Sequence, residues 1–370
     1  MVTSKWKVDK PFLTSVGILA VVGFFIFSSA SLGLLAKSGV KYSSVAFSQT
    51  FFGLFLGSLA MLFVSRMDFK LLRKYAFYFF LIAVILCILV LIPGIGYEYG
   101  GARRWFQIAG VSLQPAEILK LSFVIYFAAW AASKKDKMKN FKDGFLPLLL
   151  LFGIAAGLLL LQPDTDNFLM IVIAGLSIFL ASGGKWRYIF FLILAGTLVL
   201  GGLILTRPYV RERIDTFIHP ELNSQGSGYQ IQQSLIAIGS GGITGRGFGQ
   251  SVQKFNFLPE PIGDSIFAVA AEEFGFIGSV TLIFLFVFFA TRGLKIASRV
   301  PDLFGRLLII GIVIMITSQA FVNIGAMLGV LPLSGITLPF VSHGGTSLFI
   351  TLLEVGIILS ISKTQKFNNT

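Results

Sequence analysis

The chain has 370 residues, of which 55% are hydrophobic and only 13% are charged, whereas soluble domains carry roughly 25% charged residues. This composition, with a mean hydropathy of +0.85, excludes an ordinary water-soluble globular protein. A net charge of +13 is also compatible with nucleic-acid binding, but we expect no nucleic acid, because Lys and Arg gather at the cytoplasmic ends of membrane spans. Cys87 is the only cysteine, which excludes an intramolecular disulfide and a thiol-ligated metal cluster.

Apolar runs long enough to cross a lipid bilayer recur along the whole chain. Many spans follow the first one, which argues against a cleaved signal peptide. We therefore predict an all-α integral membrane protein, a single polytopic domain over 1–370 with ten transmembrane helices, of which the sixth is short. The predicted helices are 12–35, 45–65, 75–95, 114–133, 144–161, 167–183, 187–205, 265–291, 304–330 and 341–362.

The positions of the basic residues predict the orientation. With ten spans both termini share one side, and placing them in the cytoplasm puts about two thirds of the Lys and Arg residues there. The longest connection, the loop 206–264 between spans seven and eight, is then extracytoplasmic. Ile231, Leu235, Ile236 and Ile238 in this loop predict a short amphipathic helix at the membrane surface. The glycines after it permit tight turns and close backbone approach to a ligand.

Polar residues occur at depths where a simple anchor would avoid them. Gln114, Glu117 and Lys120 are spaced by three, so they share one helix face at the outer end of the fourth span. A buried carboxylate and ammonium are costly unless paired. They form either a structural ion pair or the wall of a cavity that binds a charged substrate, and the preceding Arg103 and Arg104 favour the cavity.

Further carboxylates lie near the ends of later spans. Asp164 and Asp166 between spans five and six either hold a divalent cation or are solvated acids in a turn. Glu260 and Asp264 precede the eighth span, where Asp264 could be simply a helix N-cap. The remaining polar residues are Glu272 and Glu273 inside that span, and Gln319, Asn323 and Glu354, for which we expect helix–helix hydrogen bonds. His219 and His343 are too few and too far apart in sequence to indicate a zinc site.

Five stretches together resemble the SEDS family, the FtsW and RodA cell-wall polymerases of bacteria. They are GARRWFQIAGVSLQPAEILKL, LQPD, GYQIQQSLIAIGSGGITGRGFGQSVQKFNFLPE, FAVAAEEFG and LPLSGITLPFVSHGGTSLF, in order from about residue 101 to 350. The resemblance implies ten spans with a large outer loop after the seventh. It also implies a peptidoglycan glycosyltransferase that extends a nascent glycan strand from lipid II, the undecaprenyl-diphosphate-linked disaccharide pentapeptide, outside the bacterial cytoplasmic membrane. The implied partners are a class B penicillin-binding transpeptidase, other division or elongation proteins, and membrane lipid.

The resemblance also assigns site residues. The essential aspartate of the family falls on Asp264. The substrate-binding positions that it implies, together with the polar residues above, are Arg103, Arg104, Gln114, Glu117, Lys120, Gln233, Ser234, Arg246, Lys254, Glu260, Ser342 and His343. The chain departs from the family pattern at Ile262, Gly263, Asp166 and His343, which stand where His, Thr, Gly and Tyr are usual. SVQK and GITLPF look closer to septal FtsW than to the elongation enzyme RodA, which stays the alternative.

Glycosyl transfer needs a base for the acceptor hydroxyl and a cation for the diphosphate leaving group. We expect Asp264 to be the base, and Arg103, Arg104, Lys120, Arg246 and Lys254 are candidates for the cation. A divalent cation, Mg²⁺ or Mn²⁺, is an alternative or supplement, with Asp264, Asp164 and Asp166 as candidate ligands. A lipid II flippase or other transporter, and a scaffold for division proteins, are alternatives of a different class. A flippase should carry its charged residues on toward the cytoplasmic face.

Overall fold

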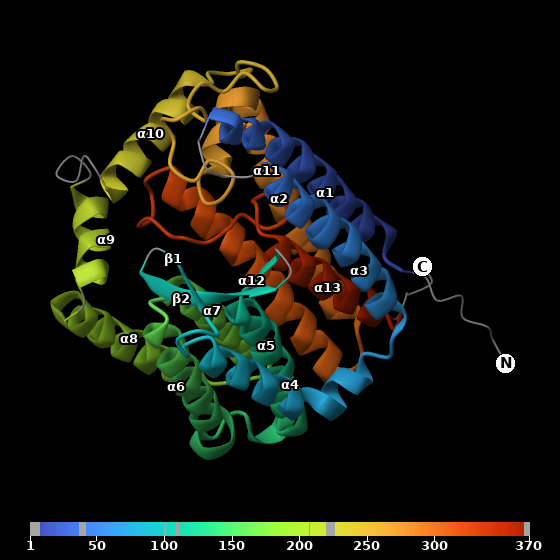
Figure 1. The fold of residues 1–370 in the computed structure, drawn as a ribbon. Helices are drawn as coiled ribbons and strands as arrows, with labels where there is room; N and C mark the ends of the chain where they lie inside the picture. The colour runs from blue at the N-terminus through green and yellow to red at the C-terminus, as the bar shows by residue number, and fades with distance from the viewer. Residues whose placement is uncertain are drawn as a thin grey trace.

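The computed structural model describes residues 8–36, 42–99, 101–108, 111–206, 208–219 and 226–365. They form a bundle of helices with a small sheet beside it (Figure 1). The α-helices are α1 (Lys10–Ser31), α2 (Tyr42–Phe47), α3 (Gly57–Arg66), α4 (Lys70–Leu89), α5 (Pro115–Ser133), α6 (Leu146–Leu161), α7 (Thr165–Ala181), α8 (Trp186–Thr206), α9 (Pro208–Ile218), α10 (Ser227–Ser240), α11 (Ile266–Arg299), α12 (Leu303–Met327) and α13 (Gly345–Ser362). The 3₁₀-helices are η1 (Leu32–Ala36) and η3 (Lys135–Lys137), and the π-helices are η2 (Ser48–Leu56) and η4 (Phe141–Phe145).

Each predicted span coincides with one helix or one continuous helical segment. In the described part of the chain, nine segments are long and apolar enough to cross a membrane. The tenth, α7, is the span predicted to be short: its 17 residues reach about 26 Å at 1.5 Å per residue. The second span is continuous through α2, the π-helical η2 and α3. The prediction of a multi-pass helical membrane protein is confirmed.

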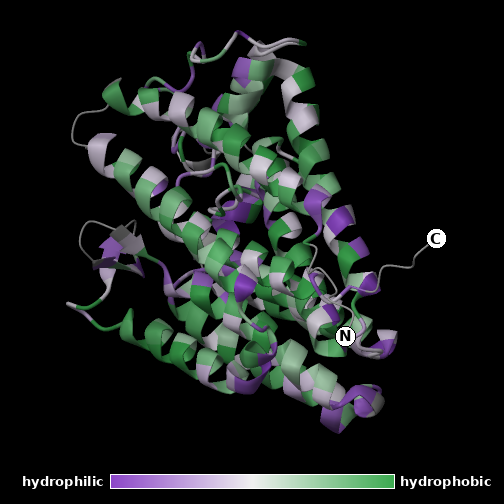
Figure 2. Ribbon diagram, turned by 90° about the vertical axis from the view of Figure 1, so that its right-hand side faces the viewer, coloured by the Kyte–Doolittle hydropathy of each residue, from purple (hydrophilic) through white to green (hydrophobic). Residues whose placement is uncertain are grey.

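Three helices form the centre of the bundle. In the apolar windows of α5, α12 and α13, 72%, 72% and 83% of the residues are buried, against 22% in α4. Helices that are apolar on all sides tolerate such an interior position. Hydrophobic residues cover most of the ribbon, while hydrophilic ones gather in connections and at a few places inside the bundle (Figure 2). Those interior polar residues build the site.

A small antiparallel sheet departs from the all-α prediction. Its strands are β1 (Tyr97–Tyr99), β2 (Ala102–Ile108) and β3 (Val111–Leu113), in that order. The pairing sets Glu98 opposite Arg103 and Phe106 opposite Leu113. The third span accordingly ends at Leu89 rather than near residue 95, and the chain crosses to α5 through this sheet. The sheet therefore fixes where Arg103 and Arg104 lie.

The long helix α11 is broken at Gly275, whose φ of 64° and ψ of −162° are not helical. The glycine-rich loop after α10 fills the break: the amides of Arg246 and Gly247 donate to the carbonyls of Glu272 and Glu273, at 3.0 and 2.9 Å. A Cβ on Gly245 would lie 2.1 Å from the carbonyl oxygen of Glu273. The predicted close approach of these glycines is thus made to helix α11 and not to a ligand.

The predicted amphipathic helix in the long connection is present as α10. Ile231 is buried, and Leu235 and Ile236 on another side of the helix are exposed. The loop 206–264 therefore contains two helices, α9 and α10, rather than irregular chain. Their position at a membrane surface stays a prediction.

Candidate active site

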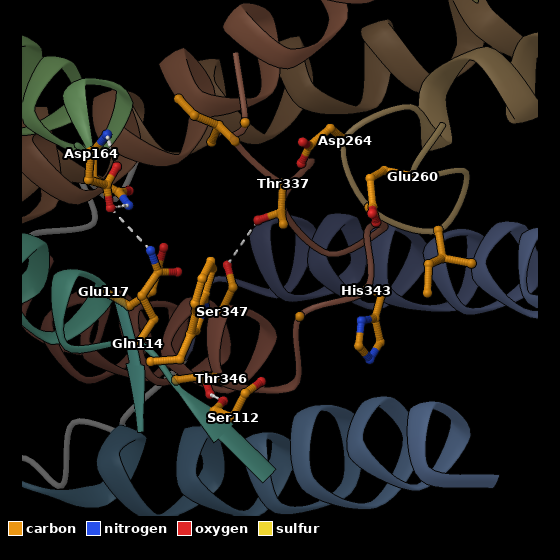
Figure 3. Close-up of a pocket in the computed structure, with 17 residues that line it drawn as sticks. Ser112, Gln114, Glu117, Asp164, Glu260, Asp264, Thr337, His343, Thr346 and Ser347 are labelled. Atoms are coloured by element: carbon orange, nitrogen blue, oxygen red, sulfur yellow. Dashed lines mark hydrogen bonds between the residues drawn. The ribbon is translucent and has the colours of Figure 1, made fainter. Parts of the chain in front are cut away.

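A cavity of about 320 Å³ lies at the end of the bundle where α5, α7, α11 and α13 begin. Its walls carry the carboxylates of Glu117, Asp164, Glu260 and Asp264. In Figure 3, Asp264 and Glu260 lie together on one side, and Asp164 and Gln114 lie across the cavity from them. The other lining residues are Trp105, Ser112, Asn167, Ile262, Gly263, Gly335, Ile336, Thr337, His343, Gly344, Thr346 and Ser347. Among these described lining residues none is Lys or Arg, so the wall itself is acidic.

Asp264 is held by its backbone and not by its carboxylate. The amide of Asn323 in α12 donates to the Asp264 carbonyl at 2.8 Å and to the Ile336 carbonyl at 2.8 Å. Ser342 donates to the neighbouring Gly263 carbonyl at 2.8 Å. The N-cap of α11 is Ser265 rather than Asp264. The capping interpretation of Asp264 is therefore wrong, and its side chain faces the cavity.

The surroundings of Asp264 favour its neutral form. Burial raises the pKa of its carboxyl group from 3.8 to about 7, and the negative charges of Glu260 and Asp166 add to the rise. The cations of Arg213 and Arg104 oppose it. The sequence left open whether burial or a helix terminus controls this group, and burial prevails. A carboxylate with a pKa near neutrality is suited to general base chemistry.

Glu260 stands beside Asp264 in an unusual backbone conformation. Its φ is 45°, in the left-handed region that favours glycine. Its carbonyl accepts hydrogen bonds from the amides of Gly263 and Ser265, at 3.0 and 3.2 Å. This turn brings the exposed Glu260 side chain to the cavity next to Asp264. Strained conformations of this kind concentrate at functional sites.

Asp164 is a structural cap as well as a lining residue. Its carboxylate accepts from the Asn167 backbone and side-chain amides, at 3.2 and 2.9 Å, and from Gln114 at 3.2 Å. Burial raises its pKa, while Arg104 and the Asn167 hydrogen bonds oppose the rise. Arg104 fixes the same turn by donating to the carbonyls of Gln162 and Pro163, at 2.8 and 2.5 Å. These contacts use most of the acceptor capacity that a metal ion would need.

Glu117 and Lys120 form a buried ion pair, with 2.8 Å between Oε1 and Nζ. Lys120 also donates to Gln319 of α12 at 2.9 Å, and Gln319 donates to the Thr337 carbonyl at 3.0 Å. Glu117 lines the cavity, whereas Lys120 lies behind it and is 1% exposed. Both interpretations therefore hold in part: the pair joins two central helices, and its carboxylate forms part of the cavity wall. Gln319 makes the expected helix–helix hydrogen bond, with Lys120. The same expectation is wrong for Asn323, which donates to backbone carbonyls of two connections.

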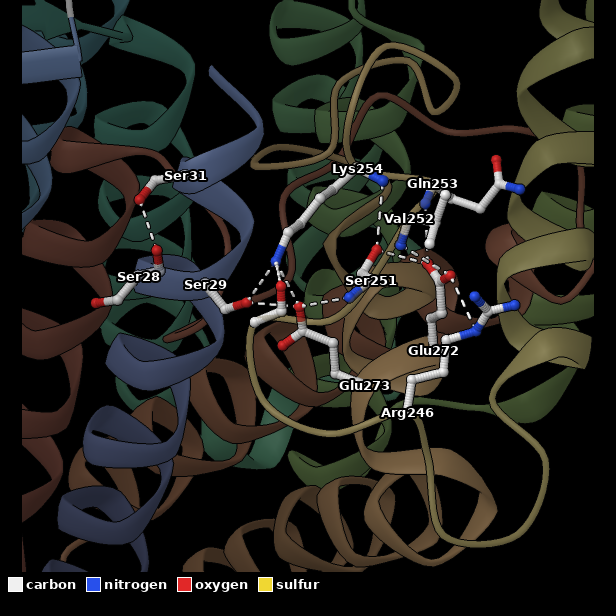
Figure 4. A network of polar contacts seen from close by, with 11 residues as sticks. Ser28, Ser29, Ser31, Arg246, Ser251, Val252, Gln253, Lys254, Glu272 and Glu273 are labelled. Atoms are coloured by element: carbon white, nitrogen blue, oxygen red, sulfur yellow. Dashed lines mark hydrogen bonds and ion pairs between the residues drawn. The ribbon is translucent and has the colours of Figure 1, made fainter. Parts of the chain in front are cut away.

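Lys254 and Arg246 belong to a separate polar network at the break in α11 (Figure 4). Lys254 is fully buried, and its ammonium lies 2.8 Å from Glu273, 3.0 Å from Ser29 of α1 and 2.8 Å from the Gly249 carbonyl. Arg246 lies 3.5 Å from Glu272. Glu272 also accepts from Ser251 at 2.5 Å, and from two backbone amides. This network ties the loop to α1 and α11, which accounts for the two buried glutamates and removes both cations from the cavity.

The other predicted site residues are also placed by the structure. Arg103 pairs with Glu98 at 2.9 Å on the sheet, outside the cavity lining. Gln233 and Ser234 lie on α10 away from the cavity, and Ser234 contacts Met327 at 3.5 Å. Ser342 positions the Asp264 loop, as described above. His343 does line the cavity, and burial lowers its pKa to about 4, so its ring is neutral near pH 7.

Several neighbours of Asp264 were not singled out from the sequence. Thr337, Thr346 and Ser347 line the cavity from the segment before α13 and from its first turn, and Thr337 contacts Ser347 at 3.3 Å. They fall inside the stretch LPLSGITLPFVSHGGTSLF, so their hydroxyl groups were the available signal. Arg213 of α9 was also missed: it binds Asp166 at 2.9 Å beside the cavity. One basic residue in a charged loop gave no such signal.

These features define a class of protein: a multi-pass helical membrane protein with a carboxylate-lined cavity at one end of its bundle. The model of the FtsW/RodA/SpoVE family, described as cell cycle protein, matches residues 10–367, and the chain belongs to this family. Stage V sporulation protein E of Bacillus subtilis is 36% identical, over 96% of this chain and 99% of its own length. A probable peptidoglycan glycosyltransferase FtsW of Coxiella burnetii is 38% identical, over 97% of both chains.

Solved structures share the fold over almost the whole chain. A chain from a structure described as a peptidoglycan synthase complex that coordinates polymerization and crosslinking superimposes with a TM-score of 0.79 at 27% identity, covering 96% of this chain and 97% of that one. Rod shape determining protein RodA of Thermus thermophilus superimposes with a TM-score of 0.70 at 26% identity, covering 98% of each chain.

Proposed function

We propose that this chain is a peptidoglycan glycosyltransferase that polymerises lipid II into glycan strands on the outer face of the bacterial cytoplasmic membrane. The observation that carries the proposal is Asp264, a carboxylate with a pKa near 7 on the wall of a cavity at one end of the bundle. The names of the curated relatives support the same activity. A substrate with a long lipid and a polar head suits a site at the end of apolar helices.

In this mechanism Asp264 acts as the general base. Its carboxylate takes the proton of the acceptor sugar hydroxyl as that oxygen attacks the anomeric carbon of the other substrate. The bond from this carbon to the diphosphate oxygen breaks, and the electron pair leaves with undecaprenyl diphosphate. A single displacement of this kind inverts the anomeric centre. Glu260 and Asp166 raise the proton affinity of Asp264, which makes it a better base near neutral pH.

A divalent cation is the open part of the proposal. Mg²⁺ is commonly held by one or two carboxylates together with substrate phosphates, and Asp264 and Glu260 fit that role. Among the described residues no group of three or more His, Cys, Asp or Glu side chains is arranged to hold a metal alone. Asp164 accepts hydrogen bonds from Gln114 and Asn167, and Asp166 accepts from Arg213 and the Gly335 amide, so the ligands we propose are Asp264 and Glu260. A cation bound by Asp264 and Glu260 would neutralise charge on the leaving diphosphate.

The variant Asp264→Asn tests the base directly. Purified protein in liposomes, supplied with lipid II, should form glycan polymer with the wild-type chain and none with Asp264→Asn, while the yield stays close to wild type and the melting temperature is not lowered. Because Asp264 does not cap α11, loss of polymer cannot be assigned to loss of a cap. If wild-type polymerisation stops in EDTA and recovers in Mg²⁺ or Mn²⁺, the reaction also requires a divalent cation. Head-group translocation without polymer would instead identify a flippase.

We propose an FtsW-like role in septal synthesis, with a class B penicillin-binding transpeptidase and other divisome proteins as partners. The FtsW names of several curated relatives support the role, and the synthase complex supports a crosslinking partner. RodA-like elongation is the alternative role, and a sporulation role is suggested by the Stage V relative. Depletion in the source bacterium should produce filaments for a septal enzyme and rounded cells for an elongation enzyme.

We also propose that both termini are cytoplasmic and the loop 206–264 is outside, on the strength of the basic residues at the opposite ends of the spans. Single cysteines at Ser133 and Ser224, in a background lacking Cys87, test this. Ser224 lies outside the described residues. An impermeant thiol reagent should label position 224 and spare position 133 in cells with a permeabilised outer envelope, and the reverse labelling would overturn the orientation.

A further inference from the structure

Among the described residues, the cavity wall offers no Lys or Arg for an anionic leaving group. Of the predicted candidates, Lys120 is committed to Glu117 and Gln319, Lys254 and Arg246 lie in the separate network, and Arg103 pairs with Glu98. Arg104 donates from two of its guanidinium nitrogens, Nε and Nη2, to the carbonyls of Gln162 and Pro163. A diphosphate brought to Asp264 therefore needs another partner, and the one nearby guanidinium in the described residues that binds a side-chain anion is that of Arg213.

Arg213 reaches the site from α9, in the long connection. Its Nη1 atom lies 2.9 and 3.0 Å from the two carboxylate oxygens of Asp166, and 3.4 Å from the hydroxyl of Thr165. The Gly335 amide donates to the Asp166 Oδ2 atom at 3.0 Å. A guanidinium and a backbone amide thus converge on one anionic oxygen.

This donor pair adjoins the catalytic group. A Cβ built on Gly335 would lie 3.7 Å from Asp264 Oδ2 and 3.8 Å from Asp166 Oδ2, so both carboxylates approach the same point. Gly335 itself lines the cavity. Asp166 and Arg213 are also close enough to influence the Asp264 charge, in opposite senses. An anion in the place of the Asp166 carboxylate would therefore sit at the cavity edge beside the base.

The bond between Arg213 and Asp166 is replaceable. Both carboxylate oxygens bind the same nitrogen, Nη1, instead of the forked two-nitrogen contact that gives Arg–carboxylate pairs their strength. The side chains are 29% and 17% exposed, so the pair is reachable. A phosphate group offers more negative charge and a geometry that matches the guanidinium fork. The pair can therefore exchange its carboxylate for a phosphate oxygen.

We propose that Arg213 and the Gly335 amide form the binding site for the diphosphate of the lipid-linked substrate, and that Asp166 fills it as a built-in anion until substrate displaces it. This inference rests on the proposed function for the identity of the ligand. It also assigns a role to Asp166, which stands at a position where the family usually has Gly. Asp166 lowers the apparent affinity for the diphosphate, because only molecules with Arg213 released can bind it.

The test measures binding apart from catalysis. Undecaprenyl diphosphate is titrated into purified Asp264→Asn protein in nanodiscs, alone and combined with changes at the pair. Asp166→Asn should tighten binding about threefold to tenfold, since the competing anion is gone. Arg213→Gln should weaken binding about tenfold or more. Combined with Arg213→Gln, Asp166→Asn should have a much smaller effect, because it then releases only the Gly335 amide. Asp166→Ala repeats the test should the Asn variant fold poorly.

A second ion pair on the same helix supplies the matched control. Arg211 and Asp215 are 3.5 Å apart and 71% and 67% exposed, and Arg211→Gln and Asp215→Asn should leave binding unchanged. Weaker or unchanged binding in Asp166→Asn overturns the inference. A tightening that is just as large without Arg213 overturns it too, because such a result would reflect general charge alone. If the variants show these shifts but wild-type protein forms no polymer from lipid II, the proposed function is refuted and the anion site stands.

Discussion

The charge of Glu260 should set the pH range in which the enzyme works. Glu260 is the largest charged contributor to the raised pKa of Asp264, after burial. The change from 3.8 to about 7 corresponds to about 4 kcal/mol of preference for the neutral form. Replacing Glu260 by Gln removes one negative charge and keeps the side-chain length and the backbone conformation. We expect Asp264 to ionise at lower pH in this variant.

The magnitude follows from the titration curve. With a pKa of about 7, the base is ionised in about one tenth of wild-type molecules at pH 6 and in about nine tenths at pH 8. Wild-type kcat/KM for lipid II should therefore fall about tenfold between pH 8 and pH 6, since this parameter reports the free enzyme. In Glu260→Gln the acid limb should move down by about one pH unit, equivalent to about 1.4 kcal/mol. A weaker base should also lower the plateau rate at high pH.

The assay is glycan polymerisation at fixed ionic strength from pH 5 to pH 9, with protein stability checked at each pH. Asp215→Asn is the control, because it removes an equally negative but exposed charge on α9 and should leave the acid limb in place. An acid limb that stays at the wild-type position in Glu260→Gln would refute the assigned electrostatic coupling. A wild-type profile that is flat from pH 5 to pH 8 would refute Asp264 as the titrating base.

Three further predictions concern stability and the buried pairs. Because the folded-state pKa of Asp264 lies above its ordinary value, its ionisation costs stability as pH rises from about 4 to 7, so Asp264→Asn should be more thermostable than wild type at pH 8 and equal to it below pH 4. Lys120→Met should abolish polymerisation and destabilise the protein by about 3–5 kcal/mol, because Glu117 is left unpaired. Adding Glu117→Gln to this variant should restore part of the melting temperature. No recovery in the double variant would argue against the ion pair. Lys254→Met should lower the melting temperature through a similar loss at Glu273, while leaving undecaprenyl diphosphate binding by the folded fraction unchanged.

The sequence predicts the fold well because each helix that crosses the hydrocarbon core needs a long apolar run, which is visible in the sequence. All ten runs are found as helical segments, including the short span that begins at Thr165. The small sheet was missed because its strands are only 3, 7 and 3 residues long and carry no membrane signal. The break at Gly275 was missed for a related reason, because the apolar pattern continues through it. The backbone groups that the break leaves unpaired are bonded by the glycine-rich loop after α10, which is distant in sequence.

The site was predictable by residue type but not by assignment of roles. Charges near apolar spans singled out Glu117, Asp164 and Asp264, and the structure shows that all three line one cavity. The same rule also marked Lys254 for the substrate, although it serves a structural network. Sequence spacing cannot distinguish a cation that faces a cavity from one that faces a buried glutamate nineteen positions away. It equally gave no reason to connect Arg213 with Asp166, which are 47 residues apart.

The contrast between Asp164 and Asp264 shows how one cavity separates a structural carboxylate from a reactive one. Both precede a helix, and both have a raised pKa because of burial. Asp164 receives three hydrogen bonds from Gln114 and Asn167 that stabilise its charge and fix its orientation. Around Asp264 the donors Asn323 and Ser342 are spent on backbone carbonyls, and among the described residues none donates to its carboxylate. The backbone is thus held rigid while the carboxylate keeps its lone pairs, so a carboxyl group that is costly to ionise is also left free to accept a proton.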